Sequence, residues 1–262
     1  MKKMRWVGWS KGERAALLLL LVVLAGCGTP LPPQVIVVGD VPATGQEARQ
    51  PDAEHPVYYF PLAVGFKEVG AIVAGEKPPQ KNDVSHALAV ALAKRHYLVM
   101  NAVHAPEQLL VFWWGSMNPQ IENFGSNDPA DQVFFNEREM LALVGAYKAG
   151  GMGWKSGDLR TAARDDRYFV IVMAFDFAEA RQHRKKLLWM TKMSTESVGT
   201  DLSSVIPALI TSGGPAFGRD TTPDWIDSGK PQKEERVILG PTEIKEYLPA
   251  DKKAADPKRP PP

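Results

Sequence analysis

Three titratable side chains that lie close together in the sequence could perform acid–base chemistry. Asp176, Glu179 and His183 stand at the end of, and just after, an almost continuously apolar stretch at 167–177. Such a stretch predicts a buried strand, and α/β proteins often present functional groups where a strand ends. No G-x-S-x-G nucleophile motif accompanies these residues in the sequence. Acids at strand ends also cap turns, and turn structure is the favoured interpretation of Asp176.

Two further patterns fall short of a ligand site. The glycine-rich segment 145–158 contains a Lys-Ser pair, but Trp154 stands where a phosphate-binding loop needs glycine before Lys155. The histidines are not spaced like the ligands of a metal ion. They are His55, His86, His96, His104 and His183. We therefore expect no metal and no cofactor.

Aromatic side chains offer a different chemistry. Trp113 and Trp114 are neighbours in an apolar stretch at 107–114 and point to opposite faces if that stretch is a strand. One ring would fill the core, and the other could stack a glycan or anchor a protein partner beside the segment GSMNP. Core packing is the favoured interpretation. The candidate binding residues are Trp114, Ser116, Asn118 and Asp176.

The only cysteine, Cys27, ends a segment typical of export signals. Residues 1–14 carry five basic side chains against one acid, and an apolar run fills 15–25. As a helix this run is roughly 16 Å long, too short for the ~30 Å core of a bilayer. Its last residues, LAGC, resemble the lipobox of bacterial type-II signal peptides. The resemblance implies cleavage between Gly26 and Cys27 and attachment of lipid, with palmitate-type acyl chains, to Cys27. The alternative is an ordinary signal peptide or membrane anchor with a chance cysteine.

Location and charge follow from this segment. Gly28 replaces the aspartate that marks retention in the inner membrane, so a Gram-negative host would carry the protein on the periplasmic face of its outer membrane. The mature chain, 27–262, has a net charge of −3. A slightly acidic chain lacks the basic surface that nucleic-acid binding requires, so we expect no nucleic-acid partner.

The elements that would position these side chains alternate between strands and helices over 57–218. Strands are predicted near 57–62, 107–114, 167–177 and 185–195. Helices are predicted to begin at Asn82 or Asp83, at Asn136 with Glu139 completing a capping box, and at Thr200 or Asp201. This order predicts an α/β sandwich in one domain, with a mixed sheet of about four to five strands and about three packed helices. Segments 115–135 and 150–166 are predicted loops.

The flanking segments differ in composition from this domain. Residues 1–26 are the predicted signal peptide, and 27–56 are rich in Pro, Gly and charge. They predict a lipidated, flexible tether, which could extend at most roughly 95 Å. Within it, the apolar residues Val35–Val38 could instead pair as an edge strand. Residues 219–262 predict a polar, Pro-rich and largely disordered tail.

Several stretches together resemble a group of uncharacterised Gram-negative lipoproteins. They are YYFPLAVGFKEVGAIVAGEKPP, ALAKRHYL, LLVFWWGSMNP and LLWMTKMST with LSSVIPALITSGGPAFG, between about 57 and 220. More loosely, the element order is similar to that of curli-export lipoproteins and the amino-terminal domain of TolB. The resemblance implies fold and location only.

The expected function is that of a non-enzymatic binding or assembly module of the cell envelope. Its partners would be membrane lipid, through acylated Cys27, and an envelope protein or a second copy of the chain. The alternative is a periplasmic hydrolase or glycan-binding enzyme that uses Asp176. A deep polar pocket joining Asp176, His183 and the GSMNP segment would favour the enzyme, whereas a shallow surface with filled strand ends would favour the binding module.

Overall fold

The computed structural model describes residues 34–71, 77–123, 132–150 and 153–227. Cys27, the predicted signal peptide and the residues from 228 onward lie outside the described residues. No helix within the described ranges is long and apolar enough to cross a membrane. The helices are α2 (Lys81–Ala93), α3 (Glu137–Val144), α4 (Trp154–Ala162), α5 (Phe177–Arg181) and α6 (Leu202–Gly213), with short 3-10 turns η1 (Ala43–Gly45) and η3 (Gly214–Ala216). The strands are β1 (Gln34–Asp40), β2 (Val57–Val69), β3 (Tyr97–Val99), β4 (Gln108–Met117), β5 (Ile121–Asn123), β6 (Gln132–Phe134), β7 (Arg167–Asp176), β8 (Leu187–Glu196) and β9 (Asp224–Asp227).

Seven of these strands form one mixed sheet in the order β3-β2-β4-β7-β8-β1-β9. β2 runs parallel to both β3 and β4, and every other neighbouring pair is antiparallel. β5 and β6 form a separate antiparallel hairpin. The α/β class expected from the sequence is confirmed. The sheet is larger than the four to five strands expected, and the described residues contain five α-helices rather than three.

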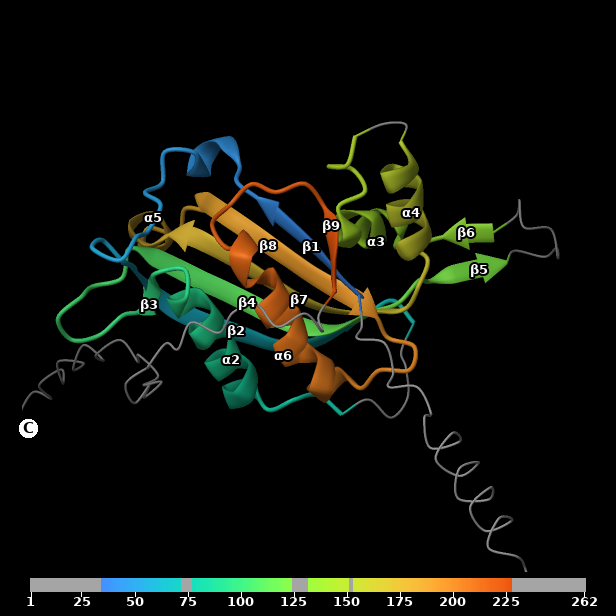
Figure 1. The fold of residues 1–262 in the computed structure, drawn as a ribbon, viewed down its shortest axis with the longest axis horizontal. Coiled ribbons are helices and arrows are strands. Elements are labelled where there is room, and N and C mark those ends of the chain that lie inside the picture. Colours follow the sequence, from blue (N-terminus) through green and yellow to red (C-terminus); the bar gives the residue numbers. More distant parts are fainter. Residues whose placement is uncertain (1–33, 72–76, 124–131, 151–152, 228–262) are drawn as a thin grey trace, which may run out of the picture.

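Helices cover both faces of the sheet (Figure 1). On one face, α2 and α6 enclose a core that includes Val35, Phe112, Trp114 and Val170. On the opposite face, α3 and α4 enclose a second core that includes Ile36. The two cores meet the two faces of the same strands because successive side chains of a strand alternate. The molecule is therefore a three-layer structure over its central strands.

The predicted elements with the clearest periodicity are present. α2 buries Val84, Leu88 and Leu92 at helical spacing. β7 is buried along most of its length on both faces, as its continuous apolar run predicts. α6 begins as one of the two predicted caps requires, because the Asp201 carboxylate accepts a hydrogen bond from the Ser204 N–H at 3.0 Å.

The expectation of a flexible tether over 27–56 is wrong for the part that the structure describes. Val35–Val38 are buried in β1, which lies between β8 and β9 inside the sheet and not at its edge. Val35 and Val37 enter one core, and Ile36 and Val38 enter the other. A strand covered on both faces needs an apolar side chain at every position, and this short run supplies four.

The expected tail also begins too early at 219. The Thr221 hydroxyl accepts a hydrogen bond from the Gly39 N–H at 2.8 Å, and β9 pairs with β1 from Gln34 to Val37. Asp220 forms an ion pair with Lys148. The described, packed part of the chain therefore extends from 34 to 227.

Three local predictions need correction. Asn136 precedes α3, but its side chain does not cap the helix; it bonds the backbone of Asn118 and Gln120 instead. The expected loop at 150–166 contains α4, and the expected loop at 115–135 begins inside β4, which reaches Met117. Tertiary packing, with Leu159 fully buried, overrides the Gly-rich composition that predicted a loop.

Candidate functional site

The candidate residues of the GSMNP region are buried. Trp114, Ser116 and Asn118 expose 2%, 0% and 1% of their surfaces, and Trp114 belongs to the core beneath α2 and α6. Core packing is therefore the role of Trp114. Trp113 points to the opposite face, where the Lys67 ammonium lies 5.7 Å from the centre of its ring. None of the three buried candidates offers a surface to a glycan.

These three residues share an unusual property. Trp114 Nε1, Ser116 Oγ and Asn118 Oδ1 are buried without a hydrogen-bond partner among the described residues. An unpaired buried polar atom costs about 1–3 kcal/mol of stability. They follow one another at alternate positions of β4 and the residue after it, so they mark one end of that strand.

Asp176 performs the structural role that the sequence favoured. One carboxylate oxygen accepts the Glu179 N–H at 3.1 Å and so caps α5, and the other lies 3.4 Å from the Lys186 ammonium. Glu179 is paired with Arg184, and this hydrogen bond lowers the pKa of Glu179. Both acids of the predicted acid–base set are thus engaged in ion pairs. His183 follows α5 in a left-handed conformation, with φ of 58°.

The two halves of the enzyme hypothesis lie at opposite ends of the sheet. Asp176 pairs with Gln108 at the start of β4, whereas Ser116 pairs with Tyr168 near its end. Eight residues of strand separate the two positions, which is about 26 Å at roughly 3.3 Å per residue. No polar pocket can therefore join Asp176 to the GSMNP segment.

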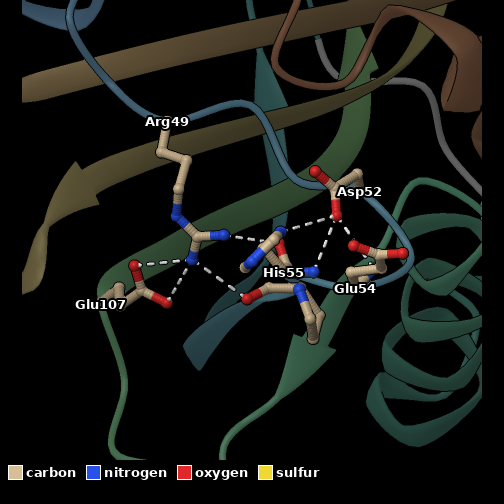
Figure 2. A network of polar contacts seen from close by, with 6 residues as sticks. Arg49, Asp52, Glu54, His55 and Glu107 are labelled. Atoms are coloured by element: carbon tan, nitrogen blue, oxygen red, sulfur yellow. Dashed lines mark hydrogen bonds and ion pairs between the residues drawn. The ribbon is translucent and has the colours of Figure 1, made fainter.

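Figure 2 shows a polar network that includes Arg49 and Glu107. Glu107 directly precedes Gln108, which pairs with Asp176, so the network lies at the sheet end that holds Asp176. The Arg49 guanidinium donates to both oxygens of Glu107, at 3.0 and 3.1 Å, and to the backbone carbonyls of His55 and Pro56. Asp52 accepts the backbone N–H groups of Glu54 and His55 at 2.9 and 2.7 Å. The bond from His55 is the main cause that lowers the pKa of Asp52.

The network fixes a connecting segment and leaves only a shallow hollow. Arg49 ties the segment before β2 to the start of β4, because Glu107 directly precedes that strand. The neighbouring hollow, of about 550 Å³, is lined by residues that include Tyr58 and His104, whose rings stack 4.2 Å apart. The hollow at this sheet end is shallow, and Asp176 is not among the residues that line it.

The outer edge of β2 is the main feature that the sequence did not predict. β3 pairs with β2 only at Val57, Tyr58 and Tyr59. From Pro61 to Val69, no described strand pairs with β2 on that side. We call Pro61–Val69 the open edge. Leu62 and Val64 on it expose 46% and 49% of their surfaces. An exposed edge strand with apolar side chains can accept a further strand.

The backbone groups of the open edge can be assigned from their neighbours. Glu107 N–H donates to Tyr58 C=O on the β4 side, and Met100 N–H donates to Tyr59 C=O on the β3 side. Because N–H and C=O alternate sides along a strand, Pro61 and Ala63 direct their polar groups outward. Proline stands where its missing N–H breaks no bond to β4.

Beyond Ala63 the open edge is interrupted by a bulge. A bulge between Ala63 and Gly65 shifts the register with β4, and Gly65 has a φ of 107°. Only glycine adopts such a conformation readily. In the sequence, only the two glycines Gly65 and Gly70, within a strand-like stretch, indicate that this edge is irregular.

A cavity of about 410 Å³ lies beneath α2 beside the open edge. Its floor includes Tyr59, Leu110 and Phe112, and Pro61 lines it as well as beginning the open edge. Burial raises the pKa of the Tyr59 hydroxyl. α2 contributes a polar wall that includes His86. The cavity could accept an apolar side chain from a segment bound along the edge.

Comparison with known proteins gives no family. No protein-family model matches the chain, and no curated protein matches it. Among solved structures, a PDZ domain protein from Parabacteroides distasonis is 9% identical with a TM-score of 0.32; the alignment covers 76% of this chain and 38% of that one. Two structures of the PelC dodecamer from Paraburkholderia phytofirmans, one a point variant, are 11% and 10% identical, with TM-scores of 0.30 and 0.29. Each covers 71% of this chain and 98% of PelC. Such weak likeness supports no functional conclusion.

Proposed function

We propose that the chain is a lipid-anchored lipoprotein of the bacterial cell envelope whose domain binds a protein partner and catalyses no reaction. The observation that carries the binding role is the open edge of β2. It offers nine residues of strand, two of them exposed apolar residues, to an added segment. The lipobox resemblance at Cys27 supports the anchor.

Strand addition would give both affinity and selectivity. The outward N–H and C=O groups near Ala63 would bond the backbone of the partner segment, and the cavity beside Pro61 would receive one of its side chains. Lys67 and Glu68 lie near the end of the open edge and are exposed. An antiparallel pairing of two copies centred on either residue would place like charges opposite each other. These two registers are therefore disfavoured between two copies of the chain, and the partner that we propose is a different protein.

The binding role is tested by changing one outward donor. Ala63→Pro removes the outward N–H and leaves the bonds to β4 intact, whereas Pro61→Ala restores an outward N–H to the same edge. In crosslinked envelopes, we expect Ala63→Pro to lose the partner complex at unchanged thermal stability. Pro61→Ala should retain or increase it. An undiminished complex in Ala63→Pro would contradict the proposal.

The anchor is tested separately. Cells fed labelled palmitate should label the wild-type protein and not the Cys27→Ala variant. Persistence of the label in Cys27→Ala would show that the lipobox assignment is wrong, whatever the result at β2.

A further inference from the structure

We infer that the end of the domain at which the chain enters the sheet rests on the lipid surface to which the protein is anchored. The contact would be made by exposed apolar side chains of the β5–β6 hairpin and of the turn after β8. This inference rests on the anchor in the proposed function and concerns a different surface from the open edge.

The first observation is the length of chain between anchor and domain. β1 begins at Gln34, only seven residues after Cys27. Seven residues span at most about 25 Å when fully extended. The expected tether of 27–56 would have held the domain far from the membrane. With β1 inside the sheet, Gln34 must lie close to the headgroups.

The second observation is what else lies at the Gln34 end of the sheet. The Thr195 hydroxyl donates to the Gln34 carbonyl at 2.9 Å, which places the end of β8 beside the start of β1. Arg167 at the start of β7 pairs with Glu196 on one side and with Met117 on the other. The chain entry and the last residues of β4 and β8 thus share one end of the molecule.

The third observation is that exposed apolar side chains gather at this end. The turn after β8 carries Val198, which exposes 70% of its surface. The β5–β6 hairpin follows β4 and projects beyond the end of the main sheet (Figure 1). Ile121, Val133 and Phe135, on and beside its two strands, expose 42%, 43% and 53%. Ile121 pairs with Phe134 and Glu122 pairs with Val133, so Val133 and Phe135 lie on one face of the hairpin and Ile121 lies on the other. Exposed apolar residues at one end of a molecule mark a contact site, and bilayers accept them at the headgroup boundary.

The hairpin is fixed to the domain at its base. Asn136 is buried, and its side-chain amide donates to the Asn118 carbonyl while its oxygen accepts the Gln120 N–H, both at 2.8 Å. The Phe135 N–H also donates to the Gln120 carbonyl at 2.9 Å. These bonds set the direction in which the described part of the hairpin leaves the sheet.

The charges at this end select the kind of lipid. Glu122, Glu196 and Asp201 are exposed there, and so are the basic side chains Lys67 and Arg164. A surface of mixed charge gains little from the negative charge of anionic lipids. The surface that fits is therefore a zwitterionic one, held by apolar contact and not by charge.

The test uses the single cysteine. The chain from Cys27 to Pro262 is coupled through Cys27 to a maleimide lipid in phosphatidylcholine vesicles, and hydroxyl-radical labelling is compared with the uncoupled chain. Val103 is the internal control, because it is exposed by 84% and lies in the β3–β4 loop at the opposite end of the sheet. We expect labelling of Phe135 and Val198 to fall several-fold and that of Val103 to stay constant. Equal labelling with and without coupling, or equal protection of Val103, would overturn the inference.

A second measurement removes the anchor. The same chain with Cys27→Ser should bind phosphatidylcholine vesicles weakly, and vesicles containing anionic lipid no more tightly. Replacing Phe135 and Val198 by serine should reduce binding by about tenfold or more, and Val103→Ser by less than about twofold. Equal losses of vesicle binding in the Phe135 and Val198 serine variant and in Val103→Ser would overturn the inference. Because maleimide coupling supplies the anchor chemically, neither result depends on lipidation in cells or on the open edge.

Discussion

At the scale of single residues, the polar side chains that drew attention in the sequence mostly serve the fold. Asp176 caps α5 and meets Lys186, and Trp114 fills the core. The sequence was enough to predict that a carboxylate, Asp176, stands at the end of the buried strand. It could not predict that Ser116 and Asn118 would be buried, because a small polar residue after an apolar run is equally typical of a turn.

The unpaired hydroxyl of Ser116 leads to a prediction about stability. Ser116→Ala should leave the free energy of unfolding unchanged or raise it, because the deleted oxygen is buried without a partner among the described residues. Thr195→Val is the matched change, since the Thr195 hydroxyl is bonded to the Gln34 carbonyl. It should lower the free energy of unfolding by about 1 kcal/mol. Urea denaturation measures both; a loss above about 1 kcal/mol in Ser116→Ala would contradict the prediction.

At the scale of elements, β1 is held by charge as well as by burial. Asp40 at its end forms ion pairs with Lys148 at 3.0 Å and with Lys192 at 3.2 Å, and Lys148 also pairs with Asp220. Burial by itself would lower the pKa of Lys148, but the hydrogen bonds to Asp220 and Asp40 outweigh it and raise the pKa. The hydrogen bond from Lys148 lowers the pKa of Asp220. Through Lys148, the cluster connects Asp40, near the start of the described domain, to Asp220, near its end.

This cluster predicts a pH window. The contribution of Asp220, whose folded pKa is lowered, is present above its unfolded value of about 3.9 and is lost as pH falls through the folded value. The contribution of Lys148, whose folded pKa is raised, is present below about 10.4 and is lost as pH rises through the folded value. Lys148→Met should therefore cost about 1–2 kcal/mol between about pH 4 and pH 10, and less outside that window.

The control for this prediction is the more exposed pair Lys155–Asp224, 3.1 Å apart. Lys155→Met should cost at most about 1 kcal/mol. Denaturant titrations of both variants and the wild type across the pH range measure the differences. A cost of Lys148→Met that does not change with pH would show that the charges do not act as described.

The elements also show which parts of the fold the sequence could predict. α2, β4 and β7 were predictable because each combines length with clear periodicity. β1 was not predictable. Its four apolar residues stand in a segment rich in Pro, Gly and charged residues, which is typical of a tether, and only the structure shows that both faces of the strand are buried. The open edge could not be predicted either. The strand-like residues of β2 do not reveal that β3 pairs with only three of them.

At the scale of the whole molecule, the proposed surfaces are separated. The end with the chain entry, Phe135 and Val198 would face the lipid, and the end with Asp176 and the Arg49–Glu107 pair would face away from it. The open edge runs along the side of the sheet between those ends. A short anchor would thus present this edge at a fixed height to a partner in the envelope.

The most direct test of this account places a photoreactive amino acid at Val64 on the open edge or, as the control, at Val103. Both are exposed valines, at 49% and 84%. After illumination of intact envelopes, we expect a covalent adduct of one defined mass from Val64, none from Val103, and loss of the Val64 adduct when Ala63→Pro is added. No adduct from Val64, or equal adducts from both positions, would contradict the claim that this edge binds a partner.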